Sequence, residues 1–466
     1  MVGRYGESLP GRLLLGRAVC LLLAVGLLIL LGVSSLGMSG VWDETVRRSA
    51  PRTIAATQLN LALNNMDAQA ANILLSSGES GTGKGRLDES YGKATGFYKE
   101  AQDTISRSLR TLSAAAEGDK ATENTVITIT EDFAHYQELI GRALENDEHP
   151  DGKDAARADY RTATDLLSAR LLPESRELVD ANNQVYNRMY DATRGDLAVQ
   201  RVAEAILGVL LIAALVLLQV RLARSFQRVF NPALLAATLC AVVAVVSAAQ
   251  LLAVNDDRMK VARRDSFDSV VALSRAKAIG YDANADESRY LLDPSRRPGY
   301  EESFHDKSQE LYGIEGASLS TYDAKLTETW AAYRSEHNDK RFSGEFRREL
   351  DNVTFAGERD AAEKAVEAYA VYESDDRSFR KLVGEGKQVE ATLFCIGWAS
   401  DTSNAHFGNW MRALDRVTAI NQSHFERATA EGRDSLITLA PAAGVALLLA
   451  AGLTVLGLRP RLAEFR

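Results

Sequence analysis

Four long apolar stretches constrain this chain more than any other feature. They cover 18–37, 202–220, 232–254 and 436–458. A helix needs about 20 apolar residues to cross a hydrocarbon core of roughly 30 Å, and each stretch is close to that length. A buried helix of a soluble domain is the alternative, but four such apolar stretches, nearly free of charge, are not typical of soluble proteins. The sequence therefore predicts an all-α membrane protein with four transmembrane helices.

Arginines in three short segments beside these stretches set the predicted orientation. The segments are 1–17, 221–231 and 459–466. Because short segments rich in Lys and Arg stay in the cytoplasm, we expect a multi-pass protein of a bacterial plasma membrane with both termini cytoplasmic. The long segments, 38–201 and 255–435, then lie outside and carry about seven and eight net negative charges. Such acidity argues against nucleic acid as a partner. Membrane lipid is expected to surround the four spans.

The first apolar stretch could instead be a cleavable signal peptide, since small residues follow it at 34–40. Its apolar run is longer than the usual signal core of about 7 to 15 residues, so we expect an uncleaved anchor. Cys20 and Cys240 lie within spans, and Cys395 has no external partner. The two long segments are therefore expected to be stabilised by packing without disulfides.

The order of span, long segment, span and short turn occurs twice, which predicts an internal repeat. MDAQAANILLSSG (66–78) and ANADESRYLLDPS (283–295) lie at matching distances after a span. Likewise, VDANNQVY (179–186) and VTAINQSH (417–424) precede the next span. Chance similarity between Ala-rich helices is the alternative.

Apolar residues in the first long segment recur at alternating steps of three and four, which indicates helices. One such series is Leu59, Leu63, Met66, Ala70 and Ile73. Breaks at 78–85, 117–120 and 149–154 divide the segment into four helices. An up-down-up-down four-helix bundle fits this pattern, because antiparallel neighbours can each bury one apolar stripe.

Three details refine this prediction. The last helix is expected to begin near Asp154, kink at Pro173 and continue into the second span. The VITIT run at 126–130 has strand character, but its neighbours keep a helical period, so it is assigned to a helix. The second long segment is predicted to be an elaborated four-helix bundle in which 342–362 is an insertion or a helical hairpin.

The polar residues form no pattern typical of catalysis or of cofactor or metal binding. None of the six His belongs to the zinc protease pattern, in which two His lie four residues apart on a helix and a Glu follows the first. GTGKG at 81–85 lacks the ending of a phosphate loop. Within the spans Glu204 is the one ionisable residue, which argues against a transport path. We therefore expect no enzyme activity, no cofactor and no metal.

The third span carries a stripe of small residues that would let another helix approach closely. The stripe consists of Ala237, Ala241, Ala244 and Ala248. Composition alone is the alternative explanation in an Ala-rich span.

Paired spans around helical segments resemble the sensor modules of bacterial chemoreceptors and histidine kinases. Here two such modules are fused, and the three cytoplasmic segments are too short to form an output domain. The full layout is similar to the actinobacterial four-span signalling proteins of the GlnX type. The local likeness is strongest at ADESRYLLD (285–293) and LDNVTFAGERDAA (350–362).

This resemblance implies a relay. An exported solute-binding lipoprotein of the glutamine/glutamate type would sense an acidic amino acid or its amide, and a cytosolic Ser/Thr protein kinase of the G type would respond. The candidate partner-facing or domain-organising residues that it implies are Asp286, Glu287, Arg289, Asn352, Thr354, Gly357 and Glu358. Capping, turn geometry or helix-surface pairing is the alternative for each of them. The candidate cytoplasmic contacts are Arg221, Arg224 and Arg228, although topology alone would also place them there.

Large external segments over little cytoplasmic mass favour a non-enzymatic transmembrane relay. If an external event is to be reported inside, the inner helix ends must act on a separate protein. A structural or scaffolding envelope protein is one alternative, and direct small-molecule sensing by the bundles is another. A homo-oligomer is compatible with all three hypotheses.

Overall fold

The computed structural model describes residues 9–77, 86–116, 119–226 and 231–463. Within these ranges the protein is helical, and its one pairing of strand type is an antiparallel bridge between Gly313 and Ser343. The chain divides into two compact units. The span unit comprises Met1–Arg47, Tyr186–Arg263 and Phe425–Arg466, and the bundle unit comprises Arg48–Val185 and Arg264–His424.

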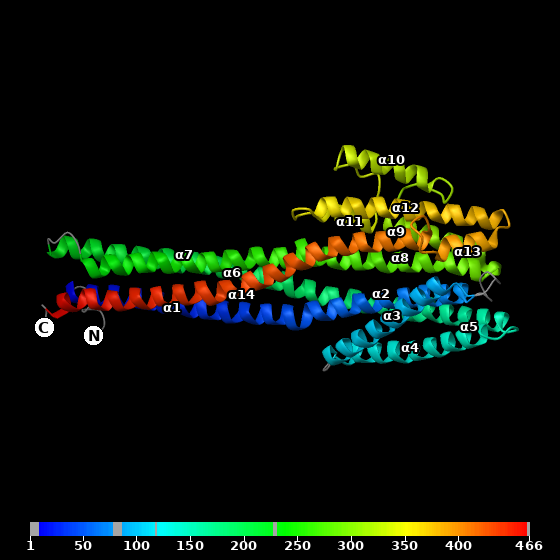
Figure 1. Ribbon diagram of the computed structural model, residues 1–466. Helices are drawn as coiled ribbons and strands as arrows, with labels where there is room; N and C mark the ends of the chain where they lie inside the picture. The colour runs from blue at the N-terminus through cyan, green and yellow to red at the C-terminus, as the bar shows by residue number, and fades with distance from the viewer. Residues whose placement is uncertain (1–8, 78–85, 117–118, 227–230, 464–466) are drawn as a thin grey trace. The chain divides into compact units, whose positions relative to one another are not determined.

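Fourteen α-helices follow one another along the described chain (Figure 1). They are α1 (Leu9–Glu44), α2 (Ala50–Ser76), α3 (Asp88–Ala115), α4 (Lys120–Asp147), α5 (Lys153–Leu166), α6 (Leu172–Phe226), α7 (Pro232–Lys260), α8 (Asp268–Leu292), α9 (Arg297–Leu311), α10 (Tyr322–Ser335), α11 (Glu345–Asn352), α12 (Glu358–Gly384), α13 (Gln388–Ile396) and α14 (Ser403–Ala463). Three π-helical segments, Thr45–Ser49, Leu167–Leu171 and Val261–Phe267, precede α2, α6 and α8, and a 3-10 turn, Pro294–Arg296, precedes α9.

Four helical stretches of the described chain are long and apolar enough to cross a membrane, as the sequence predicts. Leu27, Leu215 and Leu447 lie in the core that these helices share within the span unit. Other large aliphatic side chains of the same stretches, such as Leu22 and Leu36, are exposed. In a bilayer, exposed aliphatic side chains of this kind contact lipid.

The small-residue stripe of the third span packs inside the span unit. Ala237, Ala241, Ala244 and Ala248 of α7 are all buried in its core, which confirms the predicted packing face. Because alanine side chains are short, they allow neighbouring helices to approach closely.

A buried hydrogen-bonded chain links three helices of the span unit. Trp42 Nε1 of α1 donates to Asn255 Oδ1 of α7 at 2.8 Å, and Asn255 Nδ2 donates to Ser435 Oγ of α14 at 2.9 Å. Gly432 lies against Trp42, since a Cβ at this glycine would come within 2.3 Å of the indole ring. The fully buried Trp42 therefore needs a glycine opposite it.

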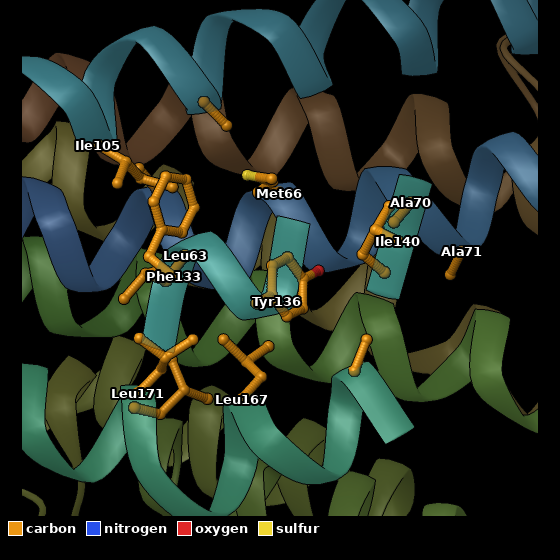
Figure 2. Packing of buried hydrophobic residues seen from close by; sticks show 14 of the residues in the cluster. Leu63, Met66, Ala70, Ala71, Ile105, Phe133, Tyr136, Ile140, Leu167 and Leu171 are labelled. Atoms are coloured by element: carbon orange, nitrogen blue, oxygen red, sulfur yellow. The ribbon is translucent and has the colours of Figure 1, made fainter. Parts of the chain in front are cut away.

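In the bundle unit, α2 to α5 bury the apolar stripes that the sequence predicts. Figure 2 shows Phe133 and Tyr136 of α4 among side chains of the other helices, with Leu63 and Met66 of α2 nearby. Burying a side chain of this size contributes about 1.5–3 kcal/mol. The VITIT run lies inside α4, so its assignment to a helix is confirmed. The break at 149–154 is also confirmed, whereas GTGKG at 81–85 lies outside the described residues.

Prolines follow two of the three π-helical segments. Thr45–Ser49 comes before Pro51, and Leu167–Leu171 comes before Pro173. Proline cannot donate the hydrogen bond that an α-helix needs, and its ring crowds the carbonyl four residues earlier. The distortion predicted at Pro173 therefore takes the form of a π segment, after which the helix continues as α6.

The two long segments, which the sequence predicts as separate bundles, pack into one unit. Leu291, Phe379 and Ile396 of the second segment belong to the same apolar core as the α2–α5 residues. A second core holds the aromatic side chains of the second segment, including Trp410 and Tyr372. The extra stretch at 342–362 forms the short helix α11, a turn and the start of α12.

Candidate functional site

Helix α8 places three charged side chains on one face. Asp282, Asp286 and Arg289 are spaced four and three residues apart, so they lie above one another on the helix. All three are buried. A buried ion needs partners, because leaving water costs it several kcal/mol.

Arg289 obtains its partners from both long segments. Its Nη2 donates to Asp67 Oδ2 of α2 at 2.6 Å, and its Nη1 donates to Asp286 Oδ1 at 2.5 Å and to Asp282 Oδ1 at 3.2 Å. Lys307 of α9 completes the group, with its Nζ 2.9 Å from Asp282 Oδ1 and 2.5 Å from Asp286 Oδ2. We call these five residues the charge cluster.

Two tyrosines support the cluster from the first segment. Tyr136 of α4 and Tyr160 of α5 donate hydrogen bonds from their hydroxyl groups to the two carboxylate oxygens of Asp67, at 2.9 and 3.2 Å. Asp67 is fully buried, and these bonds together with Arg289 satisfy both of its oxygens. The cluster therefore fixes α2, α4, α5, α8 and α9 against one another.

The pKa values of Asp282 and Arg289 reflect these ion pairs. Burial alone would raise the pKa of Asp282, but the charges and hydrogen bonds of Lys307 and Arg289 outweigh it and lower this pKa to about 2. For Arg289, burial opposes the charge, yet Asp67 and Asp286 hold its pKa well above the usual range. By composition the cluster combines three acidic side chains with two basic ones.

A cleft of about 700 Å³ opens beside the cluster. Arg176 and Ser168 come from the first segment, whereas Asp286, Lys307 and Tyr300 come from the second. The cleft therefore lies along the contact between the two long segments, within the bundle unit. Its volume is within the range of small-molecule sites, about 300–1,000 Å³.

Glu287, the neighbour of Asp286, lies in a different buried group. Its Oε2 accepts from Tyr372 OH at 3.0 Å and from Ser403 Oγ at 3.4 Å. Burial, followed by repulsion from Asp376, raises the pKa of Glu287 well above its usual range. This side chain organises the packing of α8, α12 and α14 and presents no exposed surface to a partner.

The LDNVTFAGERDAA motif forms a turn that joins three helices. Asn352 Nδ2 donates to Arg264 O at 3.1 Å and to Ser269 Oγ at 2.9 Å, near the start of α8. Glu358 Oε2 accepts from the backbone N–H of Thr354 at 2.7 Å, and its Oε1 accepts from Asn421 of α14 at 2.6 Å.

Gly357 precedes α12 and has a φ of 81°, a left-handed conformation that favours glycine. Gly357 and Glu358 therefore shape this turn, and Asn352 joins it to the start of α8. A partner-facing role for these residues stays a prediction.

The predicted cytoplasmic contacts lie near the end of α6. Arg221 and Arg224 are exposed, and Arg228 lies outside the described residues. Nearby, Gln219 Nε2 donates to Leu234 O at 2.9 Å and to Thr238 Oγ1 at 2.7 Å, which ties α6 to α7.

Asp67, Asp282 and Lys307 were not predicted from the sequence. A signal existed for Asp67, since it lies four residues after Leu63 and next to Met66 in an apolar helical series. A charged residue at such a position is buried with a partner, although the sequence does not reveal the partner. In the described part of the chain, no group of three or more His, Cys, Asp or Glu is placed to hold a metal.

Comparison with known proteins assigns a type to the first long segment. Residues 41–191 match the family model of the actinobacterial sensor domain. The match covers α2 to α5 and the start of α6. It therefore includes Asp67, Tyr136 and Tyr160, together with Arg176, which lines the cleft. No curated protein and no solved structure matches the chain significantly. The sensor domain indicates a signal-sensing role in a protein with four helices that fit a multi-pass membrane protein.

Proposed function

We propose that this protein is a non-enzymatic signal relay that crosses the membrane four times. The bundle unit lies outside the cytoplasm and receives the signal, and the ends of the spans act on a cytosolic protein. The match of residues 41–191 to a sensor domain carries the proposal. The short segments rich in arginine support the orientation, because such segments stay in the cytoplasm.

Orientation is tested with single cysteines at exposed positions, in a background where Cys20, Cys240 and Cys395 are alanine. Ser113→Cys on α3 should react with a membrane-impermeant maleimide in intact cells, and Arg224→Cys should react only after lysis. Labelling of Arg224→Cys alone in intact cells would contradict the proposed orientation.

The finer proposal names the two ends of the relay. The external input is a solute-binding lipoprotein of the glutamine/glutamate type, and the output is a cytosolic Ser/Thr protein kinase of the G type. The resemblance of the four-span layout to GlnX-type proteins supports this proposal. The acidic long segments and the minimal cytoplasmic segments are compatible with protein partners on both sides.

Photo-crosslinking in living cells tests both ends. A photoreactive residue at exposed Arg224 should capture the kinase, whereas one at Leu222, buried in the span core two residues earlier, should not. A probe at exposed Arg110 should capture the lipoprotein. Recovery of other envelope components at Arg110 and of no protein at Arg224 would favour a scaffolding role instead.

A second function, direct sensing of a small molecule, is favoured by one specific observation. The cleft of about 700 Å³ beside the charge cluster has walls from both long segments. A ligand there would contact the sensor domain and the second segment at once.

A further inference from the structure

The two walls of the cleft differ in charge. The α8 and α9 wall carries Asp282, Asp286, Asp306 and Glu310 against Arg289 and Lys307. Arg289 is also neutralised from behind by Asp67, which is fully buried and forms no part of the cleft lining. Acidic side chains therefore outnumber basic ones on this wall.

The opposite wall, from α5 and α6, carries Asp165 and Arg176. Asp165 is paired with Arg296, at 2.7 Å between Oδ1 and Nη1. Arg176 is exposed and has no ion-pair partner among the residues that the structure describes. The cleft therefore has one wall with unbalanced carboxylates and, on the other, a guanidinium that is free to bind an anion.

We propose that this cleft binds a small zwitterion, with its ammonium group on the α8 and α9 wall and its acidic group on Arg176. Carboxylates recognise ammonium, and the guanidinium fork recognises a carboxylate through two parallel hydrogen bonds. A simple amine or a simple acid can satisfy only one wall. This inference rests on the proposed sensing role, for which it names the ligand class.

The position of the cleft explains how binding would be reported. A zwitterion that contacts Arg176 of α6 and Asp286 or Asp306 of the second segment bridges the two long segments. It stabilises the arrangement in which they are packed together, because a ligand favours the state that it binds.

The test uses the full chain in lipid nanodiscs and three probes of similar size: 4-aminobutyrate, butylamine and butyrate. Calorimetry should show that 4-aminobutyrate binds roughly tenfold or more tightly than butylamine, since the amine loses a charge-assisted contact, and that butyrate does not bind measurably. Equal affinity for 4-aminobutyrate and butylamine, or no binding of 4-aminobutyrate, would overturn the proposal.

Two variants locate the site. Arg176→Gln should weaken 4-aminobutyrate to the affinity of butylamine and leave butylamine unchanged; Arg110→Gln, at an exposed arginine of α3 outside the cleft, is the control. Gly299 lines the cleft, and a Cβ there would meet no atom within 4 Å, so Gly299→Phe should fill the space without disturbing the backbone.

The Gly299→Phe variant should melt like the wild type without ligand and should lose binding. Unchanged binding in both cleft variants would place the ligand elsewhere and refute the inference. The assay contains no lipoprotein or kinase, so its outcome is separate from the crosslinking test. A chain that binds the zwitterion but crosslinks no kinase would refute the relay and leave this site standing.

Discussion

Replacing Arg289 by methionine tests whether the charge cluster holds the two long segments together. The side chain is buried, and its guanidinium bonds to Asp67, Asp282 and Asp286. Methionine keeps much of the volume but removes the cation that pairs with Asp67, and leaves Asp282 and Asp286 with Lys307. Removing one partner of a buried ion pair costs about 3–5 kcal/mol, because the remaining charges stay buried and unpaired.

This cost translates into a measurable change of melting temperature. The bundle unit has about 300 residues, and at about 2.1 cal/mol/K for each residue its unfolding entropy is roughly 0.6 kcal/mol/K. The loss of 3–5 kcal/mol then lowers Tm by about 5–8 °C. The control is Arg296→Met, at an arginine 40% exposed whose nearer partner Asp165 is 56% exposed and whose contact with the buried Asp293 is longer, at 3.9 Å. That ion pair should contribute no more than about 1 kcal/mol to the free energy of unfolding.

The assay is thermal unfolding of the full chain in detergent, followed by circular dichroism at pH 7 and pH 5. Arg289 helps to lower the pKa of Asp282, so this pKa is higher in the folded variant. The folded variant therefore binds a proton more readily on acidification, and its loss of stability relative to the wild type is smaller at pH 5. A Tm for Arg289→Met within about 1 °C of the wild type, and equal to that of Arg296→Met, would refute the reasoning.

Three further predictions concern other sites. Burial raises the pKa of Glu373 to about 7, so the folded state binds this proton more tightly than the unfolded state. The free energy of unfolding therefore falls as pH rises from about 4.5 to about 7, by at most about 3 kcal/mol. Glu373→Gln should remove that part of the pH dependence, as measured by thermal melts at pH 4.5 and 7.5. Gly432→Ala should destabilise the chain by about 1–3 kcal/mol, because the added Cβ would clash with Trp42. The control is Gly40→Ala, which has open space at its Cβ and should be neutral or stabilising. Tm measurements compare the two variants. Glu358→Ala leaves the backbone N–H groups of Thr354 and Phe355 without their acceptor and should lower the free energy of unfolding by about 2–3 kcal/mol. An unchanged midpoint in denaturant unfolding would contradict its role in holding this turn.

Local patterns predicted the helices well, because each depends on residues a few positions apart. The apolar stretches, the Ala237 to Ala248 stripe and the helix at 126–130 all follow from period and composition. The two long segments were predicted as separate bundles because nothing local shows that Leu291 and Ile396 complete the core of the first segment. Contacts of that kind join residues far apart in sequence.

The candidate site was predicted in part for the same reason. The ADESRYLLD motif contains Asp286 and Arg289, both members of the charge cluster. Their decisive partner, Asp67, is 222 residues from Arg289, so no spacing rule connects them. In the LDNVTFAGERDAA motif, the positive φ of Gly357 and the bond from Thr354 N–H to Glu358 are local, whereas the contacts of Asn352 and Asn421 join residues far apart in sequence.

The pairing of Asp67 with Arg289 also bears on why two long segments share one polypeptide. In a symmetric homodimer each surface meets its own copy, so an acid on one side must find its base on the same surface. Covalent linkage removes that restriction. One long segment can supply the carboxylate and the tyrosines while the other supplies the guanidinium. Each segment can then diverge in sequence as long as the contact between the two is kept.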